Sequence, residues 1–271
     1  MTRALLLAAG LLVAMPASAA DIFSIAETNR ATGASDTPAT VPYVHTVDVD
    51  ITETKGDKPA KRTVARLRID PSQEPGSRVT VLRRERSDGA DKALDDLIEQ
   101  IEQNDPEDQA DGFWCSARDS AAFPVAPENY DLIEAGARTV RLRPKPDRMV
   151  QLMMGEDDLS ELGGRERGIA KKLVDRLEGE LHLSARDGLM EGMHFSLTRP
   201  MKVMMIAKIR QMDMGVACER APNGYPFVSR FTMEVRAGAF GSEMHNLMEL
   251  RVGELTPVDG SPASAVTVAG R

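Results

Sequence analysis

The sequence predicts a mainly β fold, in which a strongly curved antiparallel sheet of about eleven strands forms a half-open β-barrel capped by two or three α-helices. Most segments between turn residues alternate apolar and polar side chains with a period of two, and only a few have the helical period. Aromatic residues make up only 4% of the chain, so few large rigid side chains can fill the space between sheet and helices. A curved sheet with helices over its mouth then leaves an apolar groove.

Residues 1–20 have the three parts of a secretory signal peptide. These are Arg3, the apolar stretch ALLLAAGLLVAM, and the small residues PASAA before Asp21. The apolar stretch is shorter than the roughly 20 helical residues that span a bilayer, so it is expected to be cleaved. We therefore expect a soluble, exported, periplasmic protein that begins near Asp21 and does not span the membrane. Residues 21–42 are expected to form a short helix and a flexible linker.

The charge of the chain argues against one class of partner. The formal net charge is −8, from 42 acidic and 34 basic residues. Such a charge opposes non-specific attraction to nucleic acid or to anionic lipid. We expect no nucleic-acid partner.

Cys115 and Cys218 are the two cysteines of the chain. Export would place them in an oxidising compartment, where paired cysteines normally form a disulfide bond. A bond between them closes a loop of roughly 100 residues, which the chain-entropy model values at about 4 to 5 kcal/mol. The alternative is a thiolate metal site or a reactive thiol, which has no third cysteine or C-x-x-C motif to support it.

The folded part is expected to be a single half-barrel domain at residues 43–256, and it begins with a three-stranded meander. Residues 43–53 and 61–70 each alternate apolar with polar side chains, and the turn residues TKGDKP lie between them. A third strand is expected at residues 78–86. The tail at residues 257–271 is small, polar and expected to be loose.

Helices and further strands follow the meander. One amphipathic helix is expected at residues 88–103, and a second at residues 165–179, because each has an apolar stripe at helical spacing. Residues 104–129 are less regular and hold Trp114. Further strands are expected at residues 130–135, 138–144, 148–154, 180–183, 188–198, 200–218, 227–238 and 244–255.

The hairpin around SARDG has a register that its own pattern determines. Leu181 must lie opposite Met193 if the apolar residues of both strands share one face. A three-residue loop at 186–188 gives this register by pairing Ala185 with Leu189, and it puts a glycine where such loops need one.

The histidines are expected to be ordinary strand residues. The hairpin register places His182 and His194 on the polar face, where they and Glu180 could at most form a weak surface metal site. His45 and His245 lie on other strands, and no H-E-x-x-H or G-x-S-x-G motif is present. We therefore expect no metal site, no cofactor and no enzyme activity.

The stretch PMKVMMIAKIRQMDMG, residues 200–215, holds five of the 15 methionines. A copper site would need grouped thioethers and usually histidine, and no histidine lies here. We expect instead a long bent strand that follows Pro200, continues to Cys218 and turns at APNGYP. Methionine is flexible and polarizable, so a sheet face rich in it suits variable hydrocarbon. An ordinary packed core fits these methionines equally well.

The expected groove is lined by apolar residues that share one face of the sheet. They are Val47, Val49, Ile51, Leu67, Ile69, Met193, Phe195, Leu197, Phe231, Met233, Val235 and Met248.

The segment LEGELHLSARDGLMEGMHFSLTRPMKVMMIAKIRQMDMGVACERAPNGYPFVSRFTMEVRAGAFGSEMHNLMELRVGE, residues 177–254, places an Asp-Gly turn, a strand, a Pro-led strand and a P-N-G-x-P turn in one order. With the order of strands and helices before it, this segment resembles the periplasmic lipoprotein-sorting carriers of the Lol type and uncharacterised members of their superfamily. The resemblance implies a half-open β-barrel that holds acyl chains of lipids or lipoproteins in its concave face.

The predicted function is therefore a soluble periplasmic carrier that shelters lipid or lipoprotein acyl chains in a Met-rich groove, with an envelope protein as a possible partner. The alternative is a non-catalytic periplasmic interaction or scaffold protein whose β core is fully packed. Binding of copper or another soft metal through methionines is a third hypothesis.

Overall fold

The computed structural model describes residues 40–86, 92–115, 130–135, 139–145, 164–184, 190–203, 207–239 and 241–258. The expected signal peptide, the expected N-terminal helix and most of its linker, the possible strand at residues 148–154 and the tail from residue 259 lie outside these ranges.

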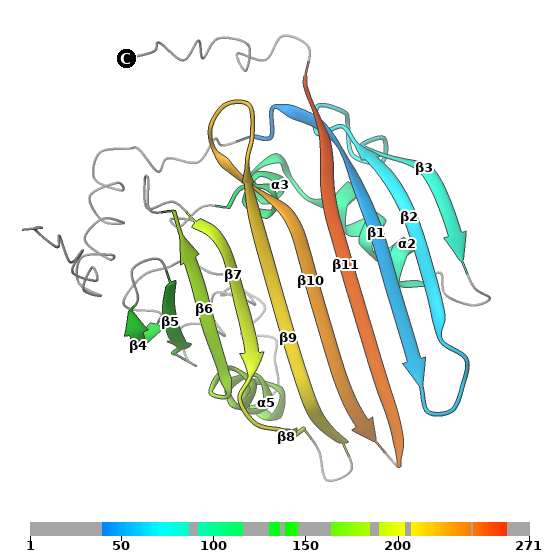
Figure 1. Ribbon diagram of the computed structural model, residues 1–271. Coiled ribbons are helices and arrows are strands. Elements are labelled where there is room, and N and C mark those ends of the chain that lie inside the picture. The colour runs from blue at the N-terminus through cyan, green and yellow to red at the C-terminus, as the bar shows by residue number, and fades with distance from the viewer. Residues whose placement is uncertain are drawn as a thin grey trace, which may run out of the picture.

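The described strands form one antiparallel sheet of eleven strands (Figure 1). They are β1 (Tyr43–Lys55), β2 (Lys61–Ile69), β3 (Val79–Arg86), β4 (Tyr130–Ala135), β5 (Thr139–Pro144), β6 (Leu177–Leu183), β7 (Met190–Leu197), β8 (Met201–Lys202), β9 (Ala207–Arg220), β10 (Pro226–Ala239) and β11 (Ser242–Pro257). Their order across the sheet is β3-β2-β1-β11-β10-β9-β7-β6-β5-β4, and β8 pairs with β9. In the described part of the chain β3 and β4 are edge strands that do not pair with each other, so the sheet is open. The predicted fold class is confirmed.

Three helices pack against the same face of this sheet. They are α2 (Lys92–Gln103), α3 (Pro106–Phe113) and α5 (Gly164–Val174). The helix expected at residues 88–103 is present as α2. The helix α3 was not expected from the sequence, because its eight residues, PEDQADGF, have too little apolar periodicity to be distinguished from a loop.

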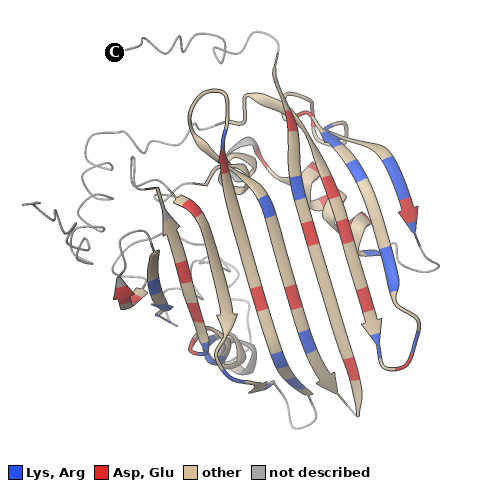
Figure 2. Ribbon diagram, in the orientation of Figure 1, with Lys and Arg blue, Asp and Glu red and all other residues tan. Residues whose placement is uncertain are grey.

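Polar residues alternate with apolar ones along each strand, so the face away from the helices carries cross-strand ion pairs. Figure 2 shows that Lys and Arg on β2 lie next to Asp and Glu on β1. Arg62 bonds Asp50 at 2.6 Å, and Arg66 bonds Glu254 at 2.6 Å. These pairs are exposed, so each contributes little to stability. They keep charged side chains on one face and leave the other face apolar.

Helix α2 covers the β1–β3 part of the apolar face. Its Leu94 is fully buried against Val49, Leu67 and their neighbours. The carboxylate of Glu102, near the end of α2, accepts hydrogen bonds from the backbone N–H groups of Gly76 and Val79, both at 2.7 Å, and of Arg78 at 3.1 Å. Burial favours the neutral acid, but these three donors outweigh it and lower the pKa of Glu102 below its ordinary value. Glu102 therefore fastens α2 to the β2–β3 loop.

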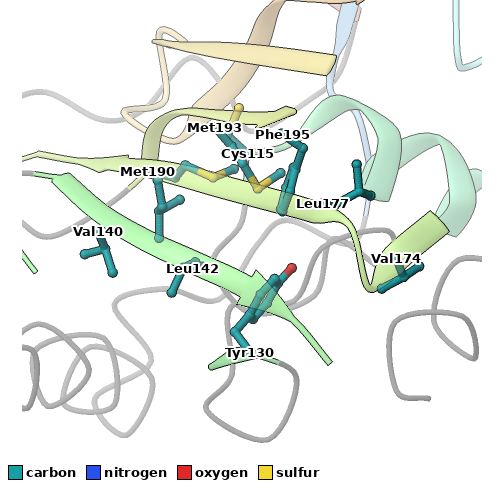
Figure 3. Packing of buried hydrophobic residues seen from close by; sticks show 10 residues of the cluster. Cys115, Tyr130, Val140, Leu142, Val174, Leu177, Met190, Met193 and Phe195 are labelled. Atoms are coloured by element: carbon teal, nitrogen blue, oxygen red, sulfur yellow. The ribbon is translucent and has the colours of Figure 1, made fainter. Parts of the chain in front are cut away.

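The other flank of the apolar face curls over itself. The rings of Tyr130 on β4 and Phe195 on β7 stack with centroids 6.4 Å apart, although β5 and β6 lie between their strands. In a flat sheet the backbones of β4 and β7 would be about 14 Å apart, and the ring of Phe195 shortens the gap because it leans over Gly179 on β6. The side chains of this flank point toward one another around Cys115 and Leu142 (Figure 3). Side chains that lean across the strands therefore pack this flank of the apolar face.

A third buried cluster, made of aromatic rings, closes one end of the sheet. Trp114 and Phe113 meet edge to face at 4.8 Å, and Phe113 stacks on Phe227 at 5.5 Å. Cys115 and Cys218 form the expected disulfide, with an S–S distance of 2.08 Å and Cα atoms 6.1 Å apart. The bond joins the end of α3 to β9 and so fixes this cluster on the sheet.

Two expected elements are corrected by the structure. The second helix ends at Val174, and β6 already begins at Leu177, because Gly179 is needed as a strand residue opposite Phe195. The stretch after Pro200 is not one long bent strand. It forms the short strand β8, which folds back on β9 so that Met201 lies opposite Ile209.

The predicted register of the β6–β7 hairpin is right in its middle and wrong near its turn. Leu181 lies opposite Met193, as expected. The register then shifts by one residue, so that Leu183 lies opposite Met190. The turn itself, with Ala185 and Leu189, is outside the described ranges. A β-bulge of this kind adds a residue to one strand without changing the apolar pattern that the prediction used.

Candidate functional site

The centre of the apolar face is a block of half-buried side chains on three adjacent strands, which we call the methionine strip. It consists of Met212, Met214 and Val216 on β9, Phe231, Met233 and Val235 on β10, and Met248 and Leu250 on β11. The register places these residues in rows across the sheet: Met214 lies opposite Met233, which lies opposite Met248. Each row is therefore continuous across all three strands.

The strip lies between the two packed flanks and is only partly included in them. Met248 and Leu250 pack against the cluster under α2, and Met214 and Val216 pack against the cluster around Cys115. The other four residues belong to neither cluster in the described part of the chain. These are Met212, Phe231, Met233 and Val235. Along β10 the apolar face is therefore the least covered.

The twelve residues expected to line a groove all lie on this face, but the structure divides them. Seven are buried in the flanks and form packed core: Val47, Val49, Ile51, Leu67, Ile69, Met193 and Phe195. Five remain half-buried: Leu197, Phe231, Met233, Val235 and Met248. The buried seven are therefore part of the core.

Sequence reasoning missed four members of the strip, namely Met212, Met214, Val216 and Leu250. The signal was present as strict alternation in MDMGV and MELRV. Lys208 and Arg210 lie earlier in β9 and are charged residues within the methionine stretch. In the structure both have exposed side chains, so they do not interrupt the apolar face.

The length of the strip matches one hydrocarbon chain. From Phe231 to Val235 the strand β10 rises about 13 Å, at about 3.3 Å per residue. The hydrocarbon core of a bilayer is about 30 Å thick, so one acyl chain extends about 15 Å. The strip can therefore contact most of the length of a single extended acyl chain.

The two ends of the strip differ in chemistry. Beyond Phe231 lies the aromatic cluster of Trp114 and Phe227, which is buried. At the other end the face becomes polar, since Asn246 lies opposite both Val235 and Glu53, and Met244 lies opposite Lys55. One end is therefore closed by packed rings and the other opens to polar, exposed residues.

The buried histidine lies near the aromatic cluster and not in the strip. His45 is 7% exposed, its Nδ1 lies 3.1 Å from the carbonyl oxygen of Tyr43, and its ring lies 4.9 Å from that of Phe113. Burial lowers the pKa of His45 below its ordinary value of 6.5, and the hydrogen bond to Tyr43 only partly opposes this. His45 is therefore held as the neutral base.

The other three histidines lie on the polar face, as expected for His182 and His194. His182 lies 3.1 Å from Glu180, His194 lies 3.7 Å from Asp213, and His245 lies 2.9 Å from Glu234. Each has a different carboxylate. Within the described ranges no group of three or more histidine, cysteine or acidic side chains is placed to hold a metal ion.

Tyr130 is the one tyrosine in the described ranges whose buried hydroxyl has no hydrogen-bond partner there. Its side chain lies in the curled flank with Phe195, and desolvation raises the pKa of the phenol. The hydroxyl is enclosed by packed side chains, so we do not assign it to the strip.

No family model matches the chain, and no curated protein matches it at a significant level. Among solved structures, the crystal structure of a DUF1329 family protein from Desulfovibrio piger matches with a TM-score of 0.24 and 10% sequence identity, over 89% of this chain and 94% of that chain. A TM-score of this size supports no conclusion about function. The resemblance to lipoprotein-sorting carriers therefore stays a prediction. No helix in the described ranges is both long and apolar enough to cross a membrane.

Proposed function

We propose that this protein is a periplasmic carrier that shelters one acyl chain of a lipid or lipoprotein on the methionine strip and that it acts without catalysis. The observation that supports the proposal most is the row Met214–Met233–Met248, an apolar surface left half-buried between two packed flanks. Unbranched thioether side chains adapt to hydrocarbon of variable shape. The disulfide supports an oxidising compartment such as the periplasm.

Binding would be driven by removing apolar surface from water. Each buried CH2 group contributes about 0.8 kcal/mol, so about ten of them contribute about 8 kcal/mol before the cost of association. A dissociation constant of micromolar order or weaker follows. Such an affinity suits a carrier, because the cargo must also leave.

The test compares substitutions on the apolar face of the sheet with one on the ion-paired face. In a displacement assay with a fluorescent fatty acid, Met233→Gln and Met212→Gln are each expected to weaken binding about tenfold, since a polar group of similar size replaces the thioether in the contact. Leu247→Gln is the matched control. Leu247 is adjacent to Met248 but lies on the ion-paired face and is 39% exposed, so this change should leave binding unaltered.

Two outcomes would contradict the carrier. Native protein that releases no lipid on extraction and does not bind the fluorescent fatty acid would reject it. Equal effects of Met233→Gln and Leu247→Gln would show that any binding takes place elsewhere. Recovery of one dominant envelope protein by cross-linking, with no lipid, would favour the scaffold alternative.

A further inference from the structure

We propose that the open end of the methionine strip is a docking surface for an anionic lipid bilayer. This end, which we call the basic end, is formed by the β1–β2 hairpin, the β7–β8 turn, the strand β8 with the start of β9, the end of β10 with the start of β11, and the last turn of α5. Figure 1 shows these segments together at one end of the sheet. The proposal that this end docks on a membrane is argued from its charges alone. The proposal that docking helps to load an acyl chain rests on the proposed function.

Exposed basic residues outnumber exposed acidic residues at this end. Among the residues that the structure describes, ten exposed basic residues lie at this end, namely Lys55, Lys58, Lys61, Lys171, Lys172, Arg199, Lys202, Lys208, Arg210 and Arg236. The four exposed acidic residues are Glu53, Asp57, Asp175 and Glu243. Since the whole chain has a net charge of −8, this local excess is opposite in sign to the protein.

The opposite end of the sheet has the reverse balance. Among the described residues, Glu74, Asp105, Glu191, Glu219 and Glu254 are exposed there, and the exposed basic residues are Arg68 and Arg220. The molecule is therefore polarised along its strands. Near an anionic surface such a molecule is turned so that its basic end approaches first.

One pair of lysines indicates that the positive charge is not fully balanced by the protein itself. Lys202 on β8 lies directly opposite Lys208 on β9. Like charges directly opposite in a sheet are destabilising. In the described part of the chain no carboxylate lies within ion-pair distance of either lysine. An external anion would relieve this repulsion.

A second like-charge pair shows how the protein neutralises such a contact elsewhere. Arg230 lies directly opposite Arg251, and the carboxylate of Glu249 bonds both, at 2.6 and 2.7 Å. Hydrogen bonds from Arg251 and from Arg230 hold the pKa of Glu249 below its ordinary value, against the effect of burial. Lys202 and Lys208 lack this third member, which is the difference that points to an external partner.

A lipid surface fits the basic end better than a single small anion does. The basic side chains come from five separate segments around the polar border of the strip. An array of anionic headgroups can contact dispersed lysines at once, each contributing a modest attraction that salt screens. Docking would place the open end of the strip at the membrane surface, where acyl chains begin.

The test uses the processed full-length chain, without cargo, in flotation with vesicles. Binding to vesicles rich in phosphatidylglycerol is expected at low salt, with none to pure phosphatidylcholine, and it should disappear at about 1 M salt, where the Debye length is about 3 Å. Lys202→Glu is expected to weaken binding about tenfold. The same change should raise the thermal midpoint, because the new carboxylate faces Lys208.

Arg220→Glu is the control, with the same change in net charge at the opposite end, and it should leave vesicle binding unchanged. Equal loss in both variants would mean that only net charge matters, and this would overturn the proposal. So would a wild-type protein that ignores anionic vesicles, including one that cross-links instead to an acidic protein. Fatty-acid binding that persists without vesicle binding would overturn docking and leave the carrier intact.

Discussion

Gly179 on β6 lies directly opposite Phe195 on β7, and the phenyl ring covers the glycine. A Cβ atom at position 179 would lie 2.4 Å from Cε1 of Phe195, far inside van der Waals contact. The missing side chain therefore gives the ring its place in the curled flank, where it also meets Tyr130. The packing of this flank therefore requires a residue without a Cβ atom at position 179.

Gly179→Ala is expected to destabilise the protein by about 1 to 3 kcal/mol, because the ring must leave its position or the strands must separate. Thermal unfolding followed by circular dichroism measures the change. Gly112→Ala on α3 is the control, since a Cβ there meets no atom within 4 Å and alanine favours the helix by up to about 1 kcal/mol. A Gly179→Ala protein as stable as the wild type would contradict the packing described.

Removal of the disulfide is expected to lower stability by about 2 to 5 kcal/mol, because Cys115 and Cys218 are 103 residues apart and their bond constrains the unfolded chain. The measurement is the unfolding midpoint with and without reductant. Trp114 is the single tryptophan and is 1% exposed, so its fluorescence reports whether the aromatic cluster opens. The double variant Cys115→Ser/Cys218→Ser should unfold at the midpoint of the reduced protein, both with and without reductant. A midpoint of this variant that changes with reductant would show that the effect of reductant does not come from this disulfide.

Stability is expected to fall as the pH drops below about 6.5, because the unfolded chain protonates His45 near its ordinary pKa of 6.5 whereas the folded protein resists the proton. The unfolded state then binds more protons, so stability is fully present above pH 6.5 and decreases below it. Denaturant midpoints between pH 8 and pH 5 measure the effect. In the His45→Gln variant, stability is expected to depend less on pH in this window. A variant with the same pH dependence as the wild type would show that another group causes it.

Glu102→Gln is expected to destabilise the protein by about 1 to 3 kcal/mol, because an amide oxygen accepts more weakly than a carboxylate and Glu102 accepts three backbone N–H bonds. The folded pKa of Glu102 is lowered from 4.5, so its contribution is present above pH 4.5 and is lost as the pH falls below that value. This window lies below that of His45. Glu99→Gln, one turn earlier on α2, is the control, and equal effects of the two changes would reject the special role of Glu102.

The strand pattern could be predicted from the sequence because burial on one face imposes alternation that local residues carry. The pairing of Leu181 with Met193 could be predicted from the residues of a single hairpin. The register shift at Leu183 does not follow from alternation, because a β-bulge changes the count of residues in one strand only. Alternation also did not reveal that the chain reverses between Met201 and Ile209, because both residues fit an apolar strand face whether the chain continues or folds back.

The candidate site could be predicted only as a face, not as an open surface. Val49 and Met233 have the same sequence character, namely an apolar residue on an alternating strand. Val49 is buried because Leu94, in a helix distant along the chain, covers it, whereas Met233 has no such partner in the described ranges. Which part of an apolar face is covered depends on the placement of helices, and alternation does not report it.

The two packed flanks share no buried side chain across β10 in the described ranges, so the backbone ladder of β9, β10 and β11 is what chiefly joins them there. A ladder without interlocked side chains above it bends more easily than a filled core. We therefore expect the sheet to bend most easily along the middle of β10, away from the aromatic cluster that holds Phe227 at the end of this strand.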